Sequence, residues 1–111
     1  MAEKEVKDID SLIDQGLNAE NNELDLREKE LDDEDLIKVL ESDKVKGVTA
    51  LFLEFNDIGD EGLKVLVESD KMKFLTALNL YKNKVTDEGL KALAKSKNML
   101  NLSELILSDN E

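Results

Sequence analysis

Three adjacent pairs of carboxylates are the residues of this sequence that could most directly do chemistry. The pairs are Asp33-Glu34, Asp60-Glu61 and Asp87-Glu88. Two carboxylates that face each other can cleave a glycosidic bond. However, the pair returns every 27 residues, and a single catalytic centre does not require such copying. Carboxylates are also favoured in the first turn of a helix, where they interact with its dipole. We therefore interpret the pairs as helix starts.

Other catalytic and metal-binding chemistries lack residues that they need. The sequence has no His and no Cys, which removes the commonest general base, the commonest metal ligand and the thiol nucleophile. Without His or Cys, no residue is available to activate a serine as a nucleophile. This applies to Ser42, Ser69 and Ser96, which follow one another at intervals of 27 residues. The acidic stretches 32–35 and 57–61 lack the ligand spacing of an EF-hand. We predict no enzyme, no catalytic residue, no metal site and no cofactor.

Composition excludes further classes of protein. The 111 residues include 15 basic and 27 acidic side chains, a formal net charge of −12. Such a chain would be repelled by nucleic acid and by an anionic membrane surface. The sequence shows neither an apolar run of membrane-spanning length nor an apolar segment near its start. We expect a cytoplasmic protein, while export by a non-classical route would leave no recognisable signal.

Apolar residues repeat with a fixed period along the chain. A Leu-x-Leu pattern begins at Leu24, Leu51, Leu78 and Leu105, and each step is 27 residues. Within a unit, the alternation at Leu51 and Leu53 predicts a short strand with one buried face. The later spacing of Leu63, Leu66 and Val67 predicts one face of a helix. Each unit is thus strand, turn, helix and return, and successive strands must run parallel.

Stacked units of this kind form a solenoid. Each unit contacts only its neighbours, and the continuous core lies between a layer of strands and a layer of helices. Helices need more lateral room than strands, so we expect the stack to curve with its strands on the concave side.

Specific residues in this period resemble a known family. The segments VTALFLEFNDI (48–58) and LTALNLYKNKV (75–85) match the leucine-rich-repeat core L-x-x-L-x-L-x-x-N-x-L, and NLSELILSDN (101–110) contains an incomplete copy. The continuations IGDEGL and VTDEGL are similar to the ribonuclease-inhibitor-like subfamily. The resemblance implies an α/β fold, a right-handed horseshoe segment with parallel strands on the concave face and helices on the convex face. It also implies that the repeated Asn satisfies backbone groups in the turn.

The resemblance divides the chain into a cap and repeats. We expect an N-terminal capping helix within 1–22 and a repeat domain over 23–111, with units 23–49, 50–76, 77–103 and a partial unit 104–111. The first unit departs from the pattern, because Lys29 stands where Asn belongs and Asp35 where Gly62 and Gly89 stand. The last strand is expected to have an open edge, covered by further repeats of a longer protein or by another molecule.

Charge is concentrated towards the N-terminus. Residues 1–41 contain 15 acidic and 5 basic residues, whereas 42–111 contain 12 and 10. This asymmetry is typical of a solvated cap that resists end-to-end stacking. Alternatively, it provides an acidic face, with Glu23 and Asp25, for a basic partner.

The strand residues that alternate with the leucines should line the concave face. Those expected to bind a partner are Phe52, Glu54, Asn79, Tyr81 and Ile106. Aromatic side chains are favoured anchors of protein interfaces, although a scattered surface Phe is also common. Phe55 and Lys82 could extend this patch, and Phe74 is expected to pack into the core.

The sequence therefore predicts a protein-interaction module with a partner of unknown identity. The alternative is a structural fragment that self-associates into a homo-oligomer through its open C-terminal strand edge.

Overall fold

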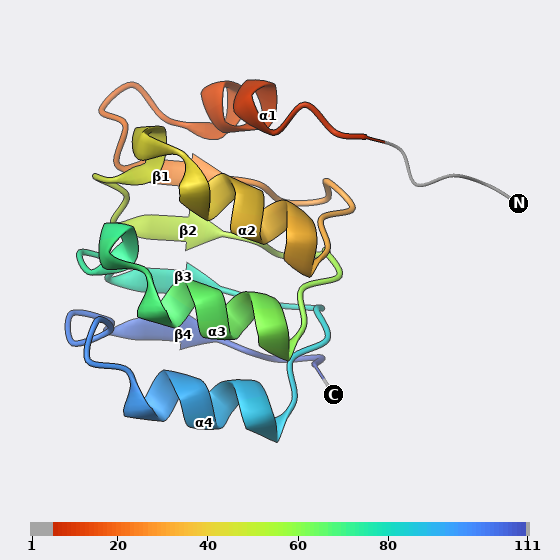
Figure 1. Cartoon of the computed structure of the whole chain (residues 1–111), viewed down its shortest axis with the longest axis vertical. Coiled ribbons are helices and arrows are strands. Elements are labelled where there is room, and N and C mark those ends of the chain that lie inside the picture. The colour runs from red at the N-terminus through yellow and green to blue at the C-terminus, as the bar shows by residue number, and fades with distance from the viewer. Residues whose placement is uncertain (1–5, 111) are drawn as a thin grey trace, which may run out of the picture.

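A computed structural model describes residues 6–110. Helices and strands alternate along the chain (Figure 1). The strands are β1 (Glu23–Asp25), β2 (Ala50–Phe52), β3 (Ala77–Asn79) and β4 (Glu104–Ile106). The helices are α1 (Ile9–Gly16), α2 (Asp33–Glu41), α3 (Asp60–Glu68) and α4 (Asp87–Lys95), with short 3-10 turns at Asp43–Val45 and Asp70–Met72.

The four strands form one open parallel sheet in the order β1-β2-β3-β4. Leu24 lies opposite Leu51, Leu51 opposite Leu78, and Leu78 opposite Leu105. Helices α2, α3 and α4 form a second layer over one side of this sheet (Figure 1). The expected α/β architecture of parallel strands alternating with helices is confirmed.

The core fills the space between the two layers. The inward leucines of β1, β2 and β3 and the helix residues Leu36, Leu63 and Leu66 are at most 1% exposed. The core is less covered at the α4 and β4 end of the stack, since Leu90 and Leu105 are each 36% exposed. Phe74 was expected in the core, and this prediction is wrong, because the ring is 52% exposed and the adjacent Leu75 is buried instead. The return turn thus directs Leu75 inward and Phe74 outward.

Helix α1 lies at one end of the stack, against β1 and α2 (Figure 1). Its apolar side contributes the fully buried Ile13 to the core. The helix begins after Asp8, whose carboxylate accepts a hydrogen bond from the Ser11 amide. On its outer side, Lys44 bridges Asp10 and Asp14 at 2.9 and 2.8 Å. Residues 1–5 of the expected capping segment lie outside the described residues.

The repeated asparagines hold the turns that follow the strands. Nδ2 of Asn56 donates to carbonyl oxygens of Leu26 and Leu53 at 2.9 and 3.0 Å, and its Oδ1 accepts from the amides of Lys29 and Leu31. Asn83 and Asn110 make corresponding contacts in their own turns. Each of these asparagines joins its own repeat to the preceding one. The first turn therefore tolerates a lysine at position 29, because Asn56 donates to the Leu26 carbonyl, the group three residues earlier that an asparagine at position 29 would satisfy.

A second set of hydrogen bonds between repeats, which we call the aspartate ladder, connects the helix starts. The sequence pattern alone did not reveal these bonds. Oδ1 of Asp33 accepts from the Gly59 amide at 2.6 Å, and Oδ1 of Asp60 accepts from the Thr86 amide at 2.7 Å. The Thr86 hydroxyl donates to the other oxygen of Asp60. The recurring aspartate thus fastens each helix start to the next repeat, in addition to interacting with its own helix dipole.

The hydrogen bonds that Asp60 makes in the aspartate ladder predict that substitution of Asp60 destabilises the fold, and that the size of this loss depends on pH. Burial would raise the pKa of Asp60, but hydrogen bonds from Thr86 and Gly89 outweigh burial and hold this pKa below its ordinary value. The stabilisation is therefore present above about pH 4 and lost as the pH falls through the folded-state pKa. We expect Asp60→Asn to lower the free energy of unfolding by about 1 kcal/mol at pH 7. Urea denaturation should show that this difference shrinks below about pH 4.

Asp87→Asn is the matched control, because Asp87 occupies the same position of the next repeat and receives no such bond within the described chain. Its substitution should change stability by less than about 0.5 kcal/mol. Equal losses for the two variants would contradict a role of the ladder.

Candidate functional site

The site predicted from the sequence lies on the side of the sheet away from the helices, which we call the strand face. Its central row consists of Asp25, Phe52, Asn79 and Ile106, which are paired one after another across the four strands. Leucines flank this row on each strand and point into the core, so the row side chains must point outward. All four are half-buried.

Tyr81 pairs with a different phenylalanine from the one in the central row. Its ring centroid lies 5.3 Å from that of Phe55, and the two rings are nearly perpendicular at 87°. This edge-to-face arrangement is favourable for aromatic rings. Nζ of Lys82 lies 5.7 Å from both centroids. Phe55, Tyr81 and Lys82 form one aromatic cluster at the ends of β2 and β3, and Phe52 lies outside it.

The turn backbone places Phe55 in this cluster. Phe55 has φ 59°, and the equivalent Glu28, Lys82 and Asp109 have φ between 55° and 59°. Each lies immediately before the Asn position of its unit. The left-handed residue recurs without glycine, so the sequence carries no glycine signal for it.

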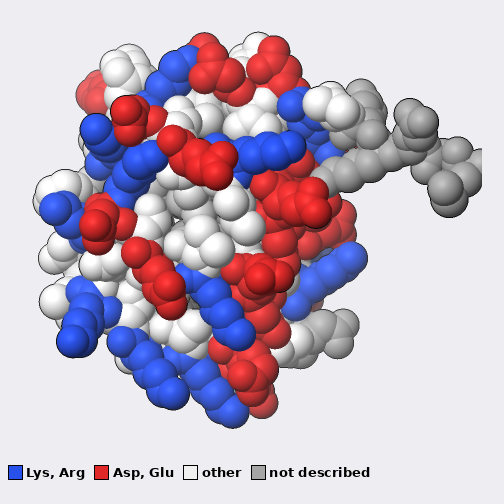
Figure 2. All heavy atoms as spheres, in the orientation of Figure 1, with Lys and Arg blue, Asp and Glu red and all other residues white. Residues whose placement is uncertain are grey.

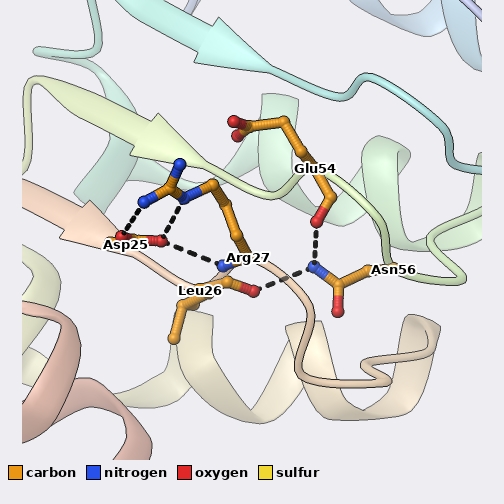
Figure 3. Close-up of polar contacts among 5 residues, drawn as sticks. All are labelled: Asp25, Leu26, Arg27, Glu54 and Asn56. Atoms are coloured by element: carbon orange, nitrogen blue, oxygen red, sulfur yellow. Dashed lines mark hydrogen bonds and ion pairs between the residues drawn. The ribbon is translucent and has the colours of Figure 1, made fainter.

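The predicted acidic face is partly neutralised. Arg27 donates to both carboxylate oxygens of Asp25, at 3.0 and 2.8 Å (Figure 3). This side-chain hydrogen bonding lowers the pKa of Asp25. Glu23 lies two residues before Asp25 on the same strand and is exposed. Of the two residues predicted for an acidic face, Asp25 is therefore already paired and Glu23 remains accessible.

The other predicted residues differ in how they are held. Oδ1 of Asn79 accepts a hydrogen bond from the Tyr81 amide at 3.0 Å, which fixes its side chain against the turn. Ile106 is half-buried on β4. The carbonyl of Glu54 accepts from Asn56, whereas its carboxylate extends away from that contact (Figure 3). The structure thus brings Phe52, Glu54 and Asn79 together and places Tyr81 beside Phe55.

The opposite, helix-covered face shows separated charges. Figure 2 shows acidic side chains gathered along the right side, over the first turns of the helices, and lysines prevailing towards the lower left. Acidic residues indeed occupy the first turns of α2, α3 and α4. Within residues 6–110, no group of three or more acidic side chains is arranged to hold a metal ion. Across the same range, none of the helices has both the length and the apolarity that a bilayer crossing needs.

Comparison with known proteins finds a family match for two of the repeats. Residues 48–67 and 71–94 match the model of the Leucine Rich repeat family. These two stretches cover β2 to α3 and β3 to α4, together with the turn before β3. Neither a curated protein nor a solved structure matches the chain.

Proposed function

We propose that this chain, which contains leucine-rich repeats, is a non-enzymatic protein-interaction module that binds a partner protein through its strand face. One observation carries the proposal. The inward positions of the strands are filled by leucines, while the outward positions and turns present Phe52, Tyr81, Phe55 and Ile106, which the core does not use. Aromatic groups at the centre of a surface are typical anchors of a protein interface.

The proposal includes the finer features that the sequence indicates. The chain is a cytoplasmic, ribonuclease-inhibitor-like repeat segment whose strand face is concave. Residues 1–22 form its cap, and residues 23–111 form its repeats. Support for the cap comes from α1, which covers the first repeat with an apolar side and presents acidic residues outward.

Affinity capture from a cell lysate tests the proposal with three forms of the protein. We expect the wild type to capture a protein that Phe52→Ala/Tyr81→Ala captures at least tenfold less, since each tenfold corresponds to about 1.4 kcal/mol of binding energy. The control Lys64→Ala/Val65→Ala removes exposed side chains from α3 on the other face and should capture as the wild type does. Circular dichroism checks that all three forms are folded. Equal capture by all three forms, or no capture by any, would contradict binding through the strand face.

A second candidate function is self-association through β4. Leu100 is 83% exposed and Leu105 is 36% exposed, and β4 pairs with β3 on one side only within the described residues. An open strand edge is a template for pairing with another chain. This candidate predicts oligomers in sedimentation velocity that Ile106→Lys converts to monomers, whereas the preferred function predicts that Ile106→Lys leaves the sedimentation coefficient unchanged.

A further inference from the structure

A hollow in the strand face lies next to Glu54. Its volume is about 320 Å³. Gly16 and Asn18 close it on the side of α1, while Asp25, Phe52 and Glu54 line it from the first two repeats. The hollow therefore combines the end of the N-terminal helix with the strand residues that the sequence singled out.

One carboxylate oxygen of Glu54, which lines this hollow, has no hydrogen-bond partner among the described residues. Oε1 of Glu54 is enclosed and receives no hydrogen bond from any residue that the structure describes. The nearby guanidinium of Arg27 attracts Glu54 through its charge but gives this oxygen no hydrogen bond, because its two side-chain hydrogen bonds go to Asp25 (Figure 3). Enclosing an unpaired carboxylate oxygen is unfavourable, and the half-buried Glu54 side chain relieves this cost when its carboxylate turns towards a donor that enters the hollow.

The surroundings of Glu54 favour a planar cation as that donor. Three carboxylates, those of Glu23, Asp25 and Glu54, line the hollow against the single guanidinium of Arg27. Phe52 also lines it, and an aromatic ring face attracts a cation placed over it. A guanidinium can stack on such a ring and still donate hydrogen bonds in its plane to a carboxylate.

We propose that this hollow receives an arginine side chain of the partner protein, which stacks on Phe52 and donates to Glu54. The inference rests on the proposed function and specifies the chemistry of the partner. It makes Glu54 the residue that selects a basic anchor, while the aromatic cluster of Phe55, Tyr81 and Lys82 provides the adjoining contact.

A nuclear magnetic resonance titration with a small probe tests this inference directly. The probe is N-acetylarginine amide, and its nearly isosteric neutral counterpart is N-acetylcitrulline amide. We expect the arginine probe to shift the amide signals of Phe52, Glu54 and Asn79 saturably, with a dissociation constant on the order of 1 mM for a ligand of this size. The citrulline probe should cause no saturable shift, because it lacks the charge.

Two variants with the same change of charge show whether Glu54 is responsible. Glu54→Gln should weaken binding of the arginine probe at least tenfold. Glu61→Gln should leave it unchanged, since Glu61 is exposed in the first turn of α3. The inference is overturned if the probe does not saturate, if its shifts spread over the acidic helix starts, or if both variants respond alike. Capture that still depends on Phe52 and Tyr81 would then show that the proposed function survives without this anchor.

Discussion

Replacement of Asn56 by alanine is expected to lower the free energy of unfolding by about 4 kcal/mol, because it removes a buried side chain that satisfies backbone groups in two repeats. The asparagine is only 7% exposed. It donates to the carbonyls of Leu26 and Leu53 and accepts from the amides of Lys29 and Leu31. Alanine leaves these groups without their partner inside the stack, and unsatisfied buried polar groups cost more than an ordinary hydrogen bond contributes. Urea denaturation monitored by circular dichroism measures the loss.

Asn110→Ala provides the comparison at the last turn. Asn110 donates to the carbonyls of Leu80 and Leu107 and accepts from the Val85 amide, but it is only half-buried. Water can replace part of these contacts, so we expect a loss of about 1 kcal/mol. Equal losses for Asn56→Ala and Asn110→Ala would show that the asparagine ladder does not depend on burial between repeats.

The second large effect is expected at Gly16. A Cβ atom at this position would overlap the backbone carbonyl oxygen of Asp25 and would lie 3.0 Å from a methyl group of Leu24. A backbone atom of β1 cannot move without disturbing the sheet, so Gly16→Ala must displace the end of α1. We expect a loss of about 3 kcal/mol, the upper range for overpacking. Thermal unfolding followed by circular dichroism measures this loss as a lower Tm.

Gly47→Ala is the matched control for Gly16→Ala. The nearest atom that a Cβ at Gly47 would meet is the carbonyl oxygen of Asn21 at 3.7 Å, an ordinary contact distance. This variant should unfold within about 0.5 kcal/mol of the wild type. If the Gly16→Ala protein had the same Tm as the wild type and the Gly47→Ala control, α1 would not be packed tightly against β1.

The arrangement of the elements could be predicted from the sequence because the same apolar pattern repeats. Leucines recur at equivalent positions of successive 27-residue units, so each unit supports the assignment made for the others. The buried faces of the strands and helices were therefore predictable even though each strand has only three residues. The helix starts at Asp33, Asp60 and Asp87 likewise follow from N-cap and first-turn preferences. Local chemistry and tertiary packing agree at these positions.

Contacts between neighbouring repeats were not predictable from residue types alone. Asp60 could be recognised as a first-turn residue, but its bonds to Thr86 depend on the distance between adjacent helices. The pairing of Tyr81 with Phe55 depends on a left-handed residue that has no glycine to mark it. For Phe74 the sequence predicted a contact that does not form. Its apolar side chain suggested burial, but the return turn directs it outward.

The candidate site was predictable as a row but not as a shaped surface. The alternation of each strand identified Phe52, Asn79 and Ile106 as outward neighbours, and the register confirms their pairing. The hollow at Glu54 was not apparent, because Gly16 and Asn18 approach it from a segment that precedes the repeats. The pairing of Arg27 with Asp25 was also missed, although Arg27 follows the last residue of β1 by two positions, the spacing that places two side chains of an extended chain on one face.

Site-specific photocrosslinking tests most directly whether the strand face is the binding surface. A photoreactive phenylalanine analogue replaces Tyr81 in one form and Val65, on the exposed side of α3, in another. Each form is illuminated with the partner obtained by capture, and crosslinked products are identified by mass spectrometry. Binding through the strand face predicts crosslinks from position 81 and none from position 65. Crosslinks from position 65 alone would contradict this surface and place the partner on the helices.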